Sequence, residues 1–197
     1  MVVVLAISAN AQKGEFKFDI NYNYSLPMGN FKSNIISNGS PRGASGDVMY
    51  SFSNTISAGL GFGFQDYYQK YPRAVYQTGK NEATSAVLSN SIQTIPFMAK
   101  IVYSPLASKA APIQPYVAGG AGFSLVSFTQ TLGEFGGTDN GASFAAQAGA
   151  GVFIPFGKLS GSGIRLGADY NYLPYNKNGF GSLNTLDVKA GVYFPIR

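Results

Sequence analysis

The chain contains no cysteine, no histidine and no tryptophan, and charged residues make up only 12% of its 197 positions. Without cysteine there is neither a disulfide framework nor a thiolate nucleophile, and without histidine a Ser/His or Cys/His nucleophile pair is impossible. The charged fraction is about half the usual share of a soluble domain. The composition therefore disfavours most hydrolytic machinery and the charged surface of an ordinary soluble protein.

Other functional patterns are also missing. The 14 lysines and arginines exceed the 9 acidic residues by five, but they are scattered, so we expect no nucleic acid partner. The glycine-rich segments GLGFGFQ and GGAGFS lack the G-x-G-x-x-G spacing of a phosphate loop, and GGTDNG holds a single aspartate. We therefore expect no cofactor and no metal.

The first residues, MVVVLAISANAQ, resemble the end of a secretory signal. Residues 2–7 form a short apolar core, and Ala9-Asn10-Ala11 offers an A-x-A cleavage site, which predicts a signal remnant at 1–11 and a mature domain at 12–197. The basic region is missing, so a short apolar terminus without export significance is the alternative. No other segment approaches the roughly 18 consecutive apolar residues of a membrane helix, so any membrane span must be β.

What the chain has in abundance is two-residue alternation. From Phe16 to Tyr24 every even position is apolar or aromatic and every odd position is polar, the period of a β-strand. Eight segments behave in this way, at about 14–25, 44–51, 56–68, 89–103, 115–129, 142–156, 164–172 and 185–196. Longer connections, such as GEFGGTDNG, tend to alternate with shorter ones. This layout predicts an all-β fold, an eight-stranded antiparallel up-and-down transmembrane β-barrel with long external loops.

The polar face distinguishes two kinds of barrel. A soluble barrel would put its apolar face inside and many charges outside, whereas here the polar face is mostly glycine, serine, asparagine and glutamine. Small polar residues suit the narrow interior of an eight-stranded membrane barrel. The membrane interpretation is favoured, and a soluble barrel carrying a lipid inside remains an alternative.

Aromatic residues gather at the ends of the predicted strands, as they do in the girdles of membrane barrels. The expected outer girdle comprises Tyr22, Tyr24, Tyr67, Tyr68, Tyr170 and Tyr172. The expected inner girdle includes Tyr103, Tyr116 and Phe194.

Charged residues on the polar faces of the first, seventh and eighth strands would meet in the lumen once the barrel closes. They are Lys17, Asp19, Arg165, Asp169, Asp187 and Lys189. Opposite charges in a narrow polar interior predict a structural plug of salt bridges rather than an ion or proton path. A carboxylate pair such as Asp169 with Asp187 could act as acid and base, but inward structural carboxylates are commoner, so we expect no catalytic residues and no enzyme.

Four stretches, YSLPMGNF, IQPYVAGGAGFSL, GAGVFIPFG and LGADYNY, resemble the small outer-membrane β-barrel domains related to the OmpA transmembrane domain, in the form common in Bacteroidota-type bacteria. The resemblance covers nearly all of the mature chain. It implies the outer membrane of a Gram-negative bacterium, with outer membrane lipid and the barrel assembly machinery as partners. Members often end in an aromatic residue, whereas here Phe194 is followed by PIR.

The expected role is structural or interactive: envelope integrity, adhesion or complex formation through the loops, with an extracellular or envelope protein as a possible partner. The alternatives are a narrow pore or a subunit of an outer-membrane transport or secretion assembly, and, third, the soluble lipid-binding barrel.

Overall fold

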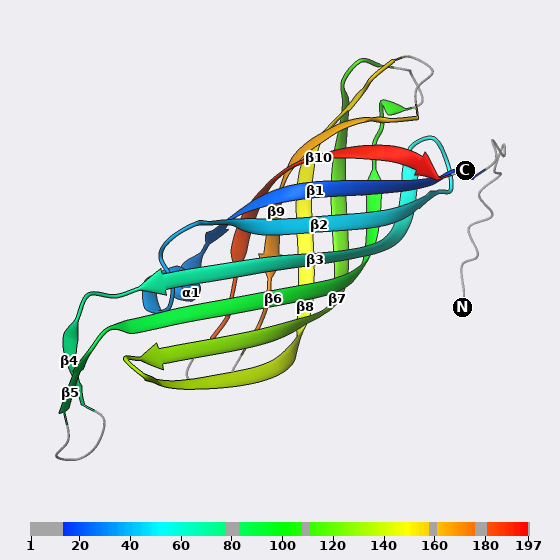
Figure 1. The fold of residues 1–197 in the computed structure, drawn as a ribbon. Helices are drawn as coiled ribbons and strands as arrows, with labels where there is room; N and C mark the ends of the chain where they lie inside the picture. Colours follow the sequence, from blue (N-terminus) through cyan, green and yellow to red (C-terminus); the bar gives the residue numbers. More distant parts are fainter. Residues whose placement is uncertain (1–13, 78–82, 108–110, 158–160, 176–180, 197) are drawn as a thin grey trace, which may run out of the picture.

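In the computed structural model, which describes residues 14–77, 83–107, 111–157, 161–175 and 181–196, eight long strands close into an antiparallel barrel (Figure 1). Their bounds are β1 (Phe16–Pro27), β2 (Ser40–Ser51), β3 (Ile56–Lys70), β6 (Leu88–Tyr103), β7 (Gln114–Leu132), β8 (Phe135–Pro155), β9 (Gly163–Tyr172) and β10 (Thr185–Ile196). Successive strands pair in sequence order, and β1 pairs with β10 to complete the ring. The predicted fold is confirmed. The predicted signal remnant, 1–11, lies outside the described residues.

The connections differ from prediction in three places. The first holds a one-and-a-half-turn helix, α1 (Gly29–Asn34), and the third holds a small hairpin of β4 (Ala74–Gln77) and β5 (Ala83–Ala86). The prediction that GEFGGTDNG forms a loop is wrong. Leu132 pairs with Phe135, so only Gly133 and Glu134 form the turn and the remaining residues extend β8.

Gly133 explains the tight turn between β7 and β8. Its φ of 63° belongs to the left-handed region, which glycine adopts without a Cβ clash, and a positive φ in the first central position is the geometry of a two-residue hairpin turn. The polar, glycine-rich residues that follow have the composition of a loop, but they form a strand because they pair with β7.

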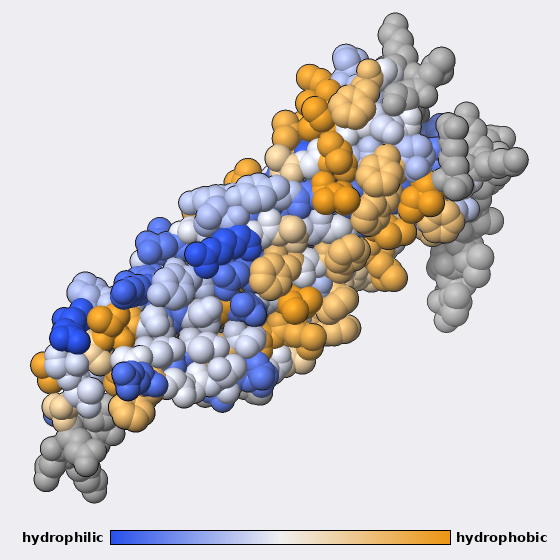
Figure 2. Space-filling model, in the orientation of Figure 1, coloured by the Kyte–Doolittle hydropathy of each residue, from blue (hydrophilic) through white to orange (hydrophobic). Residues whose placement is uncertain are grey.

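The apolar side chains point outward. On β3, Leu60 is 68% exposed, whereas Gln65 on the opposite face is 5% exposed. Figure 2 shows apolar side chains gathered over the part of the barrel nearer the end of β10, and hydrophilic side chains toward β4 and β5. An apolar exterior around a polar interior is the arrangement of a membrane barrel, so the soluble lipid-binding alternative is wrong.

The sequence did not assign which side chains of the fifth predicted strand point outward. The corresponding strand, β7, now shows this. Val117, Phe123 and Leu125 face outward, while Tyr116 and Val126 are buried inside. Separately, none of the helices within the described ranges has the length and apolarity needed to cross a membrane.

Candidate functional site

Six buried charges from five strands form an ion network across the lumen. Its members are Asp19 (β1), Asp47 (β2), Lys100 (β6), Arg165 and Asp169 (β9) and Lys189 (β10). The guanidinium of Arg165 donates through Nη1 to Asp19 Oδ2 and to Asp47 Oδ2, at 2.9 Å each. Lys100 Nζ lies 2.5 Å from Asp47 Oδ1, and Lys189 Nζ lies 2.6 Å from Asp169 Oδ2.

The register explains why Arg165 is needed. Asp19 and Asp47 stand directly opposite each other on β1 and β2, and like charges in that position repel. Arg165 reaches both carboxylates from β9, so it neutralises a repulsion that the β1–β2 pairing itself creates. The arrangement favours the structural interpretation of the predicted lumen charges.

Aromatic residues fill the lumen between this network and the barrel end that carries the start of β1 and the end of β10. Arg165 Nε donates to the Tyr116 hydroxyl at 2.9 Å, and its Cζ lies 4.9 Å from the Tyr116 ring centroid. Phe153 stacks on Tyr116 at 4.5 Å and meets Tyr193 edge-on at 5.2 Å. Met49 and Val102 complete this apolar layer. Side chains therefore fill the lumen between the ion network and the barrel end at the start of β1.

Two of the six predicted lumen charges lie outside the network. Lys17 is half-buried and forms no ion pair within the described ranges. The Asp187 carboxylate instead accepts hydrogen bonds from Ser25 Oγ, from Thr185 Oγ1 at 3.1 Å and from Asn171 Nδ2 at 2.7 Å. Hydroxyl and amide donors replace a cation at this position.

Sequence reasoning missed Asp47 and Lys100, which complete the network. Both lie on the inward face of their strands, and their partners come from strands distant in sequence. The alternation of the strands does indicate these two residues. Closing eight alternating strands brings every polar face into one lumen, so a charged residue at an odd position of β2 or an even position of β6 faces that lumen.

The aromatic girdle prediction is wrong for Tyr67 and Tyr116, each only 2% exposed. Both occupy strand positions whose side chains point into the lumen: Tyr67 lies two residues after buried Gln65 on β3, and Tyr116 contacts Arg165. The remaining girdle residues are at the outer surface: Tyr22, Tyr24, Tyr68, Tyr103, Tyr170, Tyr172 and Phe194.

An apolar plug closes the loop end of the lumen. Phe31 of α1 is fully buried and meets Tyr67 edge-on, with ring centroids 5.0 Å apart. The plug also contains Ile35, Ile36, Ile92, Val126, Phe128, Leu173, Tyr175 and Leu183. The Tyr71 hydroxyl donates to the carbonyl of Ile35 at 2.7 Å and fixes the segment after α1. The first connection is thus folded into the mouth of the barrel.

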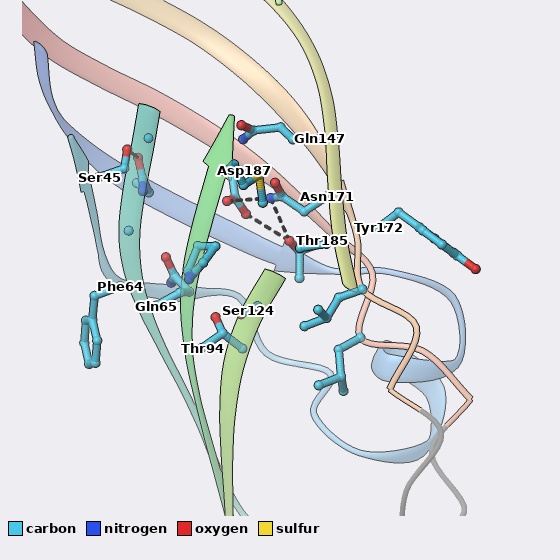
Figure 3. A pocket seen from close by; sticks show the side chains of 18 of the residues that line it. Ser45, Phe64, Gln65, Thr94, Ser124, Gln147, Asn171, Tyr172, Thr185 and Asp187 are labelled. Carbon is cyan, nitrogen blue, oxygen red and sulfur yellow. Dashed lines mark hydrogen bonds between the residues drawn. The ribbon is translucent and has the colours of Figure 1, made fainter. Parts of the chain in front are cut away.

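Between the plug and the ion network lies a cavity of about 60 Å³, here called the lumen chamber (Figure 3). Its walls carry Gln65, Thr94, Ser124, Asn171, Thr185 and Asp187. Figure 3 shows Phe64 and Tyr172 pointing away from it. The Oε1 atom of Gln65 has no hydrogen-bond partner in the described part of the chain. The volume admits about four water-sized spheres, and apolar side chains such as Met98 and Leu183 share the walls with these polar groups.

Metal chemistry finds no support in this site. Within the described ranges, no group of three or more histidine, cysteine, aspartate or glutamate residues is placed to hold a metal ion. The carboxylates of the ion network are instead engaged by lysine and arginine.

A closed antiparallel barrel of eight strands, apolar outside and with buried ion pairs inside, defines the class of small outer membrane barrels. The outer membrane protein beta-barrel domain family matches residues 1–194, and the chain belongs to that family. The protein is therefore placed in the outer membrane. No curated protein sequence shows a significant match.

Solved structures share the fold at low sequence identity. Ail, the attachment invasion locus protein of Yersinia pestis, solved with the heparin analogue sucrose octasulfate, is 17% identical, with a TM-score of 0.52 over 93% of this chain and 100% of that one. Neisserial surface protein A is 13% identical, with a TM-score of 0.56 over 93% and 97%. A major outer membrane protein from Thermus thermophilus is 14% identical, with a TM-score of 0.57 over 92% and 99%.

Proposed function

We propose that this protein is a non-enzymatic, non-conducting barrel that works by contact, anchoring in the outer membrane and presenting its outer hairpins to an envelope or extracellular protein. The observation that carries the proposal is the closure of the lumen at two levels, by the ion network around Arg165 and by the plug around Phe31. A barrel closed in this way has its accessible surface at the lipid-facing wall and the loops. Outer membrane lipid and, during biogenesis, the barrel assembly machinery are its other expected partners.

The outer hairpins supply the contact surface. β8 pairs with β7 from Phe135 to Phe153, but with β9 only from Ala146 onward, so residues 135–145 extend beyond the β9 pairing on one side. Phe135 at the turn is 78% exposed, and Val75 on the β4–β5 hairpin is 71% exposed. Exposed apolar side chains on hairpins held by a rigid barrel are typical of binding loops.

The closed lumen leads to an electrical prediction. Purified protein reconstituted into planar bilayers is expected to give no steady single-channel current, because an ion would have to displace the Arg165 bridges and the plug residues. Insertion is verified separately by the heat-modifiable shift on SDS gels. A reproducible steady conductance from heat-modifiable protein would contradict the proposal and favour the narrow pore or transport subunit.

The hairpin can be shortened at its tip, which removes only the last three β6–β7 pairs, Asn90–Gln130, Ser89–Thr131 and Leu88–Leu132. Thr129 and Thr138 are a cross-strand pair with hydroxyl oxygens 3.1 Å apart, so residues 130–137 can be replaced by an Asn-Gly turn. We expect the shortened protein to insert normally but to lose adhesion and crosslinked partners on cells that express it. The matched control replaces residues 53 and 54 of the turn at the opposite end with Asn-Gly. Retained adhesion and crosslinking by the shortened form would rule this hairpin out as the contact site.

A further inference from the structure

The barrel wall has a break in its hydrogen-bonded ladder between β3 and β6. The register runs from Ile56 opposite Tyr103 to Phe62 opposite Phe97 and resumes at Gln65 opposite Thr94. The two intervening pairs, Gly63 with Pro96 and Phe64 with Ile95, are absent from the ladder. On its other side, β6 pairs continuously with β7, so the break is specific to one wall contact. We call this break the β3–β6 seam.

Local chemistry accounts for the seam. Pro96 has no backbone N–H to donate and is disfavoured in the middle of a sheet. Gly63 offers no side chain to cover the gap, and a Cβ built on it would meet Pro96 Cγ at 3.3 Å. Irregular backbone at membrane depth is tolerated where it is buried in protein or lines a water-filled cavity. The seam meets this condition, because Gly63 and Pro96 both line the lumen chamber.

Apolar side chains surround the outer side of the seam. Phe62, Phe64, Ile95 and Phe97 are 37% to 49% exposed and face outward. On the inner side, Met98, Phe31 and Leu183 line the chamber together with its polar groups. In Figure 3, Phe64 points away from the chamber whereas Gln65 and Thr94 lie at it. The seam therefore joins a lipid-facing apolar surface to an internal cavity.

Basic residues lie above the seam on the same wall. Arg42 of β2 pairs with Asp66 at 3.1 Å and is 62% exposed in its side chain, and its Cζ lies 6.0 Å from the Tyr68 ring. Asp66 is two residues beyond Phe64, which is about 7 Å along a strand. Lys70 and Arg73 are exposed further along. These four charged residues carry a net charge of +2 on the wall between the seam and the outer connection after β3.

We propose that the β3–β6 seam binds the hydrocarbon chain of an anionic membrane amphiphile, whose chain end enters the lumen chamber and whose headgroup meets Arg42 and Lys70. The chamber's volume of about 60 Å³ admits the last carbons of one chain rather than a whole lipid. The inference rests on the wall and the chamber, and it holds whether or not the outer hairpins bind a protein.

The absence of cysteine makes the seam directly testable, because any thiol in a variant is the introduced one. In Met98→Cys the thiol lines the chamber, in Phe97→Cys it faces lipid, and in Val102→Cys it is buried beyond the ion network. Each variant is folded in phosphatidylcholine vesicles and exposed to 12-maleimidododecanoic acid, whose maleimide is at the chain end opposite the anionic carboxylate, and mass spectrometry follows thiol addition. We expect labelling of Met98→Cys and Phe97→Cys, and little labelling of Val102→Cys.

Closing the seam is the decisive comparison. Adding Pro96→Val restores a backbone N–H opposite Gly63, so labelling of Met98→Cys should slow by about tenfold because the restored hydrogen bonds must open first. Labelling of Phe97→Cys should be unchanged by Pro96→Val. Equal rates for Met98→Cys with and without Pro96→Val would overturn the proposal, as would faster labelling by a sulfonated, membrane-impermeant maleimide. Heat-modifiable gel migration selects folded samples of every variant.

The headgroup is tested by competition. Dodecyl phosphate should protect Met98→Cys from 12-maleimidododecanoic acid, and dodecyltrimethylammonium should not, because the basic residues favour an anionic head. Protection by dodecyl phosphate should weaken when Arg42→Gln and Lys70→Gln are combined. Equal protection by the two amphiphiles, or none by dodecyl phosphate, would overturn the assignment of an anionic amphiphile.

Discussion

Replacing Arg165 with methionine is expected to destabilise the folded barrel by about 3 to 5 kcal/mol, the usual cost of removing one partner from a buried ion network. Methionine approximates the length of the side chain but leaves Asp19 and Asp47 facing each other at less than about a tenth exposure. It also removes the hydrogen bond to Tyr116 and the stacking on its ring. Urea unfolding in lipid vesicles, followed by loss of heat-modifiable migration, measures the change.

The matched control is Arg42→Met, which breaks an arginine–aspartate pair whose arginine side chain is 62% exposed. Solvent screening limits such a pair to about 0 to 1 kcal/mol. Adding Asp19→Asn to Arg165→Met should recover part of the loss, because it removes one of the two facing carboxylates. If Arg165→Met were no less stable than Arg42→Met, or if Asp19→Asn made it worse, the network would not be holding the β1–β2 register.

Replacing Leu60 with arginine is expected to disfavour the inserted, folded state by about 2 to 4 kcal/mol, the cost of a charge on the lipid face of a barrel near the membrane midplane. Leu60 is 68% exposed on the outer wall of β3, six residues before Asp66 and four after Ile56. The penalty arises from removing water from the guanidinium, so it should appear on unfolding in lipid vesicles and shrink in detergent micelles.

Phe135→Arg is the control for Leu60→Arg. Phe135 is even more exposed, at 78%, but it lies at the turn of the β7–β8 hairpin. There an arginine remains hydrated, and the stability should change by no more than about 0.5 kcal/mol. Similar losses for the two variants would mean that exposure alone, rather than contact with lipid, sets the cost and that Leu60 does not face the membrane.

The strands and their facing could be predicted because a single local rule governs them. Alternation from Phe16 to Tyr24 is visible over nine residues, and its physical cause, opposite solvents on the two faces of one wall, acts on every strand in the same way. The predicted span 185–196 and the observed β10 coincide. The predicted span 56–68 falls short of β3 by only two residues, where the pattern becomes polar.

The contents of the lumen could be predicted only in part, because they depend on contacts between distant strands. The charges of the first, seventh and eighth strands were expected to meet, but the partners of Asp47 are fixed by the closed ring rather than by neighbouring residues. The plug was not predictable from periodicity, since α1 has six residues and owes its position to burial of Phe31 against Tyr67. The same contact explains why an aromatic residue expected in the girdle faces inward.

The position of Arg165 also bears on how the barrel is assembled. Its two carboxylate partners lie 146 and 118 residues away in the sequence, and β9 reaches them across the lumen only when β10 has paired with β1. Before that step Asp47 can pair with Lys100 of β6, but Asp19 requires water or a counterion, which makes a partly formed sheet costly to move into lipid. Folding and insertion are thereby coupled. Ring closure joins strands that are distant in sequence and is therefore a late event, and it completes the pairing of the interior charges that allows them to be removed from water.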